Sequence, residues 1–244
     1  MKSDINYIQL RNYLFFFIQV LCLQACSSQE NTLEAQDENL NSNTWEFDTL
    51  EGWKDGSQNL NNQINYNISN GVLKIYTRAN TWDRPKIKTQ EKNYKQGRYL
   101  WRIFVPEMGV GDKASVGAFI YSDDGHELDF EIGYGSESVR QDLNAKENDL
   151  VVYMTSQANP FQSIVKTIER NKWYTVELDL KLVNEKYLAV WFIDDVEKTR
   201  LNLNYGEDTR FYIFCSVENL QFIGDHIPSQ DNYGVFDTVQ YTAY

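Results

Sequence analysis

The chain has 244 residues and carries 23 Lys and Arg against 35 Asp and Glu, so its formal net charge is −12. Such an acidic protein is a poor match for the phosphates of nucleic acid, and we expect no nucleic-acid partner. It contains 16 Tyr, 13 Phe and 6 Trp but only 4 Pro, which is enough large apolar residues for a sizeable core.

The first 25 residues have the character of an export signal. Lys2 and Arg11 accompany an apolar run at 13–23 that is much too short to span a membrane. Residues 23–28 read Leu-Gln-Ala-Cys-Ser-Ser, and a small residue followed by Cys here resembles the lipobox of bacterial lipoproteins. The resemblance implies cleavage before Cys26 and lipidation of its thiol, which would anchor the protein to a bacterial membrane, at the outer membrane or cell surface. An ordinary secretory signal with an incidental Cys is the alternative.

The rest of the chain divides into a tether and one domain. Residues 26–43 are polar and acidic, which is typical of a flexible tether. Residues 44–244 fit a single domain. Cys22 lies in the signal and Cys26 is the expected lipidation site, so Cys215 is left alone and no disulfide is expected within the mature chain. We assign Cys215 to the core.

From Thr44 onward the sequence is rich in strand patterns separated by turn residues. We expect strands at 71–77, 99–105, 115–121, 127–134, 150–155, 173–182, 187–193, 210–217 and 235–244. Residues 164–170 fit either one helical turn or a strand. Many short strands with regular turns predict an all-β sandwich or barrel.

Residues 127–131 read Glu-Leu-Asp-Phe-Glu, with a carboxylate at every second position. Side chains alternate along a strand, so Glu127, Asp129 and Glu131 share one face while Leu128 and Phe130 point into the layer behind. At ~3.3 Å per residue the outer Cα atoms lie ~13 Å apart. If both Glu side chains lean inward by roughly 3–4 Å, their carboxyl groups lie about 5–6 Å apart, near the ~5–5.5 Å that retaining glycosidases use. A solvated strand face is the alternative, but three like charges in a row repel, which favours a site.

Taken with its surroundings, this pattern resembles the family 16 glycoside hydrolases, whose signature is Glu-x-Asp-x-Glu with or without one extra residue. Residues 95–106 are similar to the family's Gly-x-Tyr-Glu-x-Arg strand, which ends in Pro. Residues 173–178, 190–194 and 236–241 resemble later family strands in the right order. The resemblance implies a β-jelly-roll sandwich of two curved antiparallel sheets, like concanavalin A, with sugar bound across the concave face.

Carried over to this chain, the resemblance makes Glu127 the nucleophile and Glu131 the general acid, with Asp129 assisting through hydrogen bonds and charge. We expect further sugar contacts from aromatic and basic residues around the acids: Arg102, Phe119, Tyr121, Trp82 and Phe222. Core packing is the alternative for Phe119 and Tyr121, and an exposed surface position is the alternative for Arg102. Trp101, Trp173 and Trp191 lie within expected strands and are assigned to the core.

Residues 84–102 form a basic stretch, with seven Lys or Arg against only Glu91, a net charge of +6. Such a run is more often the solvated side of two strands and their turn, and we favour that interpretation. The alternative is a surface for a sulfated or uronic-acid polysaccharide.

We expect no cofactor for catalysis, because the two His, His126 and His226, have no metal-ligand spacing. The resemblance does imply a structural calcium on the convex side, with Asp237 and the carbonyl of Gly71 at the matching positions.

The sequence thus predicts an exported, lipid-anchored, monomeric glycoside hydrolase that cleaves a β-linked polysaccharide of the β-glucan or galactan type with retention. Two alternatives stay open: a non-catalytic carbohydrate-binding lipoprotein on the same fold, and a transglycosylase. The intact acid triplet favours an enzyme. Leu100 favours the binder, because it stands where the family usually has a sugar-binding Glu.

Overall fold

Alternating burial along the strands separates a core side from an outer side. In β6 (Gly97–Val105), Tyr99, Trp101 and Ile103 are fully buried, whereas Leu100 and Arg102 between them are partly exposed. One face of each such strand is apolar, so two sheets must pack face to face to cover both apolar faces.

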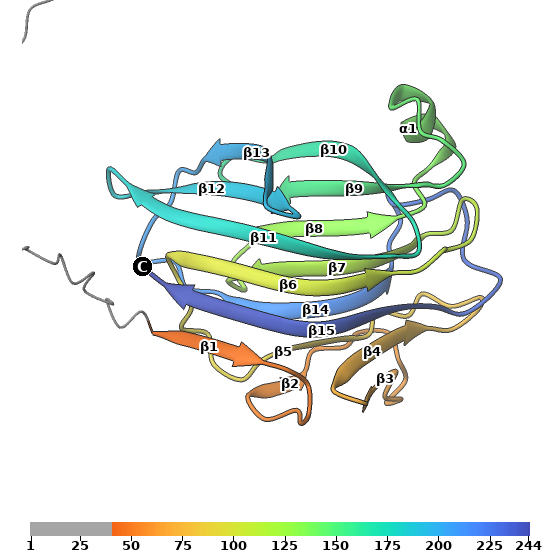
Figure 1. Ribbon diagram of the computed structural model, residues 1–244, viewed down its shortest axis with the longest axis horizontal. Coiled ribbons are helices and arrows are strands. Elements are labelled where there is room, and N and C mark those ends of the chain that lie inside the picture. Colours follow the sequence, from red (N-terminus) through yellow and green to blue (C-terminus); the bar gives the residue numbers. More distant parts are fainter. Residues whose placement is uncertain (1–40) are drawn as a thin grey trace, which may run out of the picture. The chain divides into compact units, whose positions relative to one another are not determined.

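The computed structural model describes residues 41–244, which form two antiparallel sheets (Figure 1). Across sheet A the order is β13 (Val196–Asn202), β12 (Lys186–Ile193), β11 (Lys172–Val183), β6, β15 (Asn232–Ala243), β4 (Val72–Thr77) and β3 (Tyr66–Ser69), and β1 (Ser42–Trp45) also pairs with β15. Across sheet B the order is β10 (Gln162–Glu169), β9 (Asp149–Ser156), β8 (Glu127–Gly133), β7 (Ala114–Tyr121), β14 (Tyr212–Asn219), β5 (Lys86–Thr89) and β2 (Trp53–Asp55).

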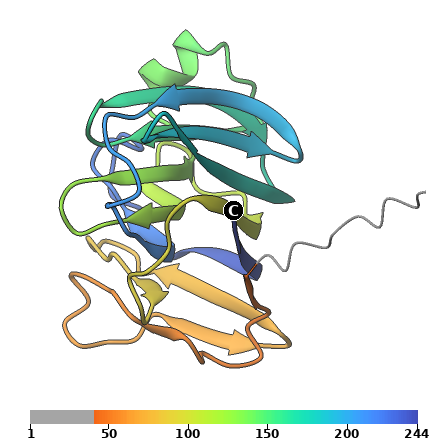
Figure 2. The ribbon, with the colours of Figure 1, turned by 90° about the vertical axis from the view of Figure 1, so that its left-hand side faces the viewer.

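The two sheets lie one behind the other, with β8, β7 and β14 behind β11, β6 and β15 in Figure 1 and the layers seen from the side in Figure 2. The core between them is continuous, and two indoles cross it. Trp101 of sheet A donates a hydrogen bond to the carbonyl of Phe214 in sheet B at 3.0 Å, and Trp191 donates to the carbonyl of Asp129 at 3.1 Å. These bonds fix the backbone of β14 and β8 against the opposite layer.

The predicted all-β sandwich is confirmed, and residues 162–169 form a strand instead of a helical turn. Cys215 is fully buried in the core, as expected. The one helix of residues 41–244, α1 (Glu137–Asp142), begins at the N-cap Ser136 and has only six residues, too few to leave a periodic signal. No helix in this part of the chain has the length and apolar character needed to cross a membrane.

The expected signal peptide at 1–25 and the lipidation site Cys26 lie outside the described residues, as does most of the 26–43 tether. β1 begins at Ser42, two residues before the expected start of the domain, where Ser42 pairs with Thr242 of β15.

Candidate active site

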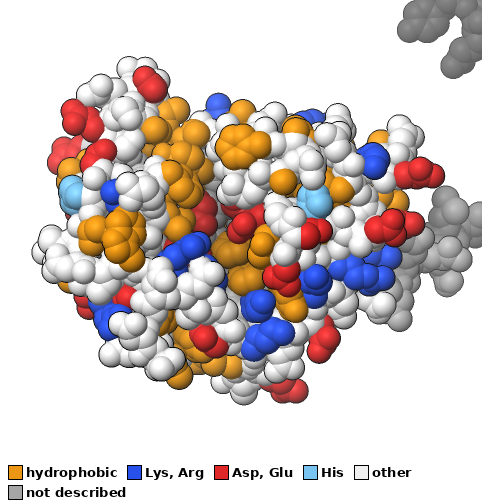
Figure 3. All heavy atoms as spheres, turned by 180° about the vertical axis from the view of Figure 1, so that it is seen from behind, with side chains coloured by type: hydrophobic (Ala, Val, Ile, Leu, Met, Phe, Trp, Pro, Cys, Tyr) orange, Lys and Arg blue, Asp and Glu red, His pale blue; other side chains and the backbone are white. Residues whose placement is uncertain are grey.

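Three acids lie together on the outer face of sheet B. Leu128 and Phe130 of β8 pack in the core, so Glu127, Asp129 and Glu131 point to the opposite face. Seen from that side, the molecule is hollowed, with acidic side chains in the hollow and basic side chains below it (Figure 3). The predicted clustering of the three carboxyls on one strand face is thus present.

Burial keeps protons on these acids. Loss of solvation, together with the smaller effect of the negative charge of Glu218, raises the pKa of Glu127 to about 7 and that of Glu131 to about 8. The Ser115 hydroxyl donates a hydrogen bond to Glu131 and opposes the rise. Glu127 therefore has the lower pKa of the two and is substantially ionised at neutral pH, when Glu131 is still mostly protonated.

Asp129 lies between the two Glu residues and is fully buried. Burial raises the pKa of its carboxyl well above the usual value, and the charges of Glu127 and Glu131 add to the rise. Gln157 donates to its Oδ2 at 2.7 Å, while Oδ1 accepts no hydrogen bond from any residue of 41–244. A protonated Asp129 donates a hydrogen bond to Glu127, and this bond lowers the pKa of Glu127.

A fourth carboxylate, Glu218 at the end of β14, completes the acidic centre. It is buried, and its Oε2 lies 2.7 Å from Nζ of Lys86 and is also paired with the guanidinium of Arg84. Its register partner Ser115 is the residue that donates to Glu131. Sequence reasoning missed Glu218; a charged residue ending an apolar strand was the available signal, but its partners lie about 130 positions earlier in the chain.

Gly117 leaves the space that Glu131 occupies. The two residues are register partners in β7 and β8, and a Cβ on Gly117 would lie 2.9 Å from Glu131 Oε1 and collide with the hydroxyl of Ser216. A side chain at this position would therefore displace the carboxyl group.

The sequence matches no protein-family model and no curated protein. The structure, by contrast, resembles many solved ones. A β-glucanase of Bacillus licheniformis aligns with a TM-score of 0.61 over 84% of this chain and 99% of that chain, at 16% identity. The endo-1,3-β-glucanase of Streptomyces sioyaensis gives a TM-score of 0.60 over 82% and 94%, at 13% identity. A family 16 protein of Bacteroides ovatus, solved with a mixed-linkage glucan product, gives 0.56 over 82% and 99%, at 15% identity. The chain has the fold of the family 16 β-glucanases.

On this glucanase fold, Phe119 and Tyr121 lie beside the acids as predicted. Phe119 is the register partner of Asp129 and Tyr121 that of Glu127, so both rings are on the face of the three carboxyls. Phe119 is mostly buried and stacks on Phe214, with ring centroids 4.5 Å apart and planes at 11°. Phe119 and Tyr121 line a cavity of about 300 Å³ together with Glu127.

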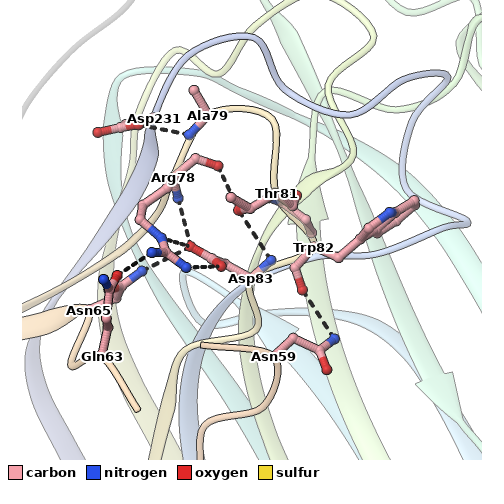
Figure 4. Close-up of polar contacts among 10 residues, drawn as sticks. Asn59, Gln63, Asn65, Arg78, Ala79, Thr81, Trp82, Asp83 and Asp231 are labelled. Atoms are coloured by element: carbon pink, nitrogen blue, oxygen red, sulfur yellow. Dashed lines mark hydrogen bonds and ion pairs between the residues drawn. The ribbon is translucent and has the colours of Figure 1, made fainter. Parts of the chain in front are cut away.

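Trp82 extends from a loop that a buried ion pair holds in place. Asp83 is fully buried and accepts from Nε of Arg78 at 2.7 Å, while Asn59 donates to the carbonyl of Trp82 at 3.1 Å (Figure 4). The indole points away from this network, is 44% exposed and lies 5.4 Å from the ammonium of Lys113. Its contact with sugar stays a prediction.

Phe222 lies on the other side of the acids, next to β9. Its exposed ring packs edge-on against Tyr153, with centroids 5.6 Å apart, and Tyr153 is the register partner of Glu131. Its position agrees with a platform at the rim, and its role in binding stays a prediction.

The prediction that Arg102 reaches the cleft is wrong. β6 belongs to sheet A, so Arg102 lies on the far side of the sandwich, where its guanidinium stacks over Trp173 at 5.6 Å and donates to Thr175 at 3.3 Å. Trp173 is accordingly 38% exposed and not in the core. Leu100 has the same parity as Arg102, so the sequence argument for a lost sugar contact at Leu100 also fails.

The predicted calcium site has oxygen donors but no acidic cluster. Residues 41–244 contain no group of three or more His, Cys, Asp or Glu side chains placed to hold a metal ion. Asp237 lies at a register shift in β15, while a Cβ on Gly71 would lie 3.6 Å from a carboxylate oxygen of Asp48 and 3.9 Å from the carbonyl of Glu46. Such oxygens are hard donors of the kind that calcium prefers, and a structural calcium held by Asp237 and Gly71 stays a prediction.

Proposed function

We propose that this protein is a retaining, endo-acting glycoside hydrolase that cleaves a β-linked polysaccharide. One observation carries the proposal: two Glu side chains, four residues apart on one strand face, have raised and unequal pKa values in a hollow that is open to solvent. Two carboxyls with different protonation states are what acid–base and nucleophilic catalysis at a glycosidic bond require. The glucanase fold, shared with endo-acting enzymes, supports an open cleft that takes internal chain segments.

In the first step, the ionised Glu127 attacks the anomeric carbon while the protonated Glu131 gives its proton to the leaving oxygen. The C–O bond to the leaving chain breaks as the bond to Glu127 Oε forms, which gives a covalent glycosyl-enzyme and a free sugar hydroxyl. Asp129 donates its hydrogen bond to Glu127 and so holds that carboxylate in position until the bond forms.

In the second step, Glu131 is a carboxylate and acts as general base. It takes a proton from water, whose oxygen attacks the anomeric carbon and displaces Glu127. Two inversions restore the original anomeric configuration, and both carboxyls return to their starting protonation states.

A reducing-end assay tests the proposal over a panel of β-glucans, agars, carrageenans and xyloglucan. We expect cleavage of at least one polymer by the wild type, and a loss of about 10²–10⁴-fold in kcat for Glu131→Gln and at least as much for Glu127→Gln. Cleavage that persists in both variants would show that the assigned residues are wrong.

The same assay separates the alternatives. Binding of a polymer without any cleavage would identify a non-catalytic carbohydrate-binding protein. Longer chains formed without net release of reducing ends would identify a transglycosylase.

We also propose that the protein is exported and anchored to a membrane through a lipid on Cys26. The proposal rests on the apolar run at 13–23 and the Cys that follows it. Metabolic labelling with a radioactive fatty acid should mark the wild type and leave Cys26→Ala unlabelled. A mature protein whose N-terminus is elsewhere than Cys26 would rule out the anchor.

A further inference from the structure

Two lysines face each other on the cleft surface of sheet B. Lys54 of β2 is the register partner of Lys88 of β5, and Lys88 is the register partner of Phe214 in β14. Phe214 in turn pairs with Phe119, and Phe119 with Asp129. A single row of side chains therefore leads across the strands from the two lysines to the centre of the acid triplet.

This row borders one cavity. Lys88, Phe119 and Phe214 line the space of about 300 Å³ that Glu127 also lines. Strands lie ~4.8 Å apart, so Lys88, three strands from β8, is about 14 Å from the acids across the sheet. The stacked rings of Phe119 and Phe214 form the apolar floor of the cavity. A polysaccharide crossing the strands from the acids would reach the lysines after a few sugar rings.

Neither lysine has a carboxylate partner among residues 41–244, although other cations of the cavity do. Arg84 and Lys86, which line the cavity, are both paired with Glu218. The ammoniums of Lys88 and Lys54 lie over the ring of Tyr212, at 4.1 and 4.9 Å from its centroid, and Lys54 also donates a hydrogen bond to the carbonyl of Gln90 at 2.7 Å. Like charges directly opposite each other on a sheet repel, and no carboxylate among residues 41–244 forms an ion pair with either lysine to offset the repulsion.

The basic stretch at 84–102 is thus divided by the fold. Its later part lies on β6 in sheet A, where Arg98 is paired with Glu177 and Arg102 stacks on Trp173. Its earlier part lies on β5 in the cleft, and Lys54 of β2 extends it.

We infer that Lys54, Lys88 and Tyr212 form a subsite for an anionic sugar, carrying either a sulfate ester or a uronic-acid carboxylate, in the same cleft as the acids. The inference rests on the proposed function and names the class of its substrate. The two ammoniums bind the anionic group, while Tyr212 holds them side by side and presents its hydroxyl end to the sugar.

Binding measurements on full-length mature protein test the subsite with three probes: a sulfated galactan, a β-linked polymannuronate and the uncharged glucan laminarin. We expect one anionic polymer to bind most tightly, and Lys88→Gln and Lys54→Gln each to weaken that binding by tenfold or more at 50 mM NaCl. The effect should shrink at 300 mM NaCl, because the contact is a partly exposed charge interaction. The polymer affected identifies the anion as sulfate or carboxylate.

Lys74→Gln is the matched control, because Lys74 lies 4.3 Å from the ring of Tyr233 on sheet A, away from the cleft. It should leave all three affinities unchanged. Melting temperatures of the variants show whether the fold is intact.

Each outcome separates this subsite from the proposed enzyme. If laminarin is cleaved and binds at least as tightly as both anionic polymers, or if the lysine variants bind them like the wild type, the subsite is overturned and the hydrolase stands. Lysine-dependent binding without cleavage of any polymer supports the subsite and overturns the hydrolase. No binding of any probe contradicts the subsite.

Discussion

Glu218 and its two basic partners set the charge around the acids of β8. The negative charge of Glu218 raises the pKa of both Glu127 and Glu131, whereas Lys86 lowers both. Activity requires an ionised Glu127 and a protonated Glu131, so we expect kcat/KM to be highest between pH values of about 7 and about 8 and to fall on either side.

Glu218→Gln should move this profile to lower pH. The substitution removes a charge that raises both pKa values and frees Lys86 and Arg84, which lower that of Glu127. The measurement is kcat/KM against pH on the polymer that the wild type cleaves best.

Glu177→Gln is the matched control on sheet A, because Glu177 is an equally buried carboxylate paired with Arg98. Both variants break a buried ion pair and should lose stability, but only Glu218→Gln should shift the profile. An unchanged profile in Glu218→Gln would remove Glu218 from the account of the site.

The raised pKa of Glu131 favours catalysis but lowers folding stability at high pH. Its folded pKa of about 8 lies above the ordinary value of 4.5, so the unfolded chain loses this proton at lower pH than the folded protein. The unfolded state therefore binds fewer protons between these values, and the contribution of Glu131 to folding stability falls as pH rises from about 4.5 through about 8.

Glu131→Gln should consequently melt at a higher temperature than the wild type at pH 9, with a difference that shrinks towards pH 5. Thermal unfolding followed by circular dichroism at several pH values measures this. A variant that is less stable at pH 9 than the wild type would contradict the raised pKa.

At the scale of elements, β7 supplies the surface against which the acids lie. Gly117→Ala should displace the Glu131 carboxyl, and a misplacement of ~1 Å costs up to about 10²-fold in rate. We expect a fall in kcat with little change in KM, because sugar binding elsewhere in the cleft is unaffected.

The double variant Gly117→Ala/Ser216→Ala separates two causes, since the added Cβ would meet both Ser216 and Glu131. Activity should stay low if contact with Glu131 is responsible. Recovery of wild-type kcat in the double variant would instead assign the effect to Ser216.

Strand periodicity predicted the shared face of Glu127, Asp129 and Glu131, because alternation is a local property of the chain. It did not predict Arg102 correctly, since parity specifies which residues share a face but not which sheet the strand joins. β6 pairs with β11 and β15, and only that long-range pairing places Arg102 on the far side from the acids.

Short strands were missed for a related reason. β5 has four residues and β2 has three, too few for a periodic pattern, yet they carry Lys88 and Lys54, neither of which has a carboxylate partner among residues 41–244. The pairing of Glu218 with Lys86 likewise depends on β14 lying beside β5, which no local pattern encodes.

At the scale of the whole molecule, the sandwich divides two roles between its layers. Sheet A contributes the indoles that fix the backbone of β8 and β14, and sheet B carries the acids and the neighbouring cations on its outer face. The all-β sandwich that the strands and turns predict is confirmed, and so is the jelly roll that the resemblance to family 16 implies, although identity to the solved glucanases is only 11–16%.

Trapping of the glycosyl-enzyme shows directly whether Glu127 is the nucleophile. Glu131→Gln lacks the general base for the second step, so an aryl oligosaccharide of the cleaved polymer, whose leaving group needs no acid, should accumulate the covalent intermediate. Peptide mass spectrometry should find the sugar on Glu127. Release of product with no label on Glu127, or with inverted anomeric configuration, would contradict the account.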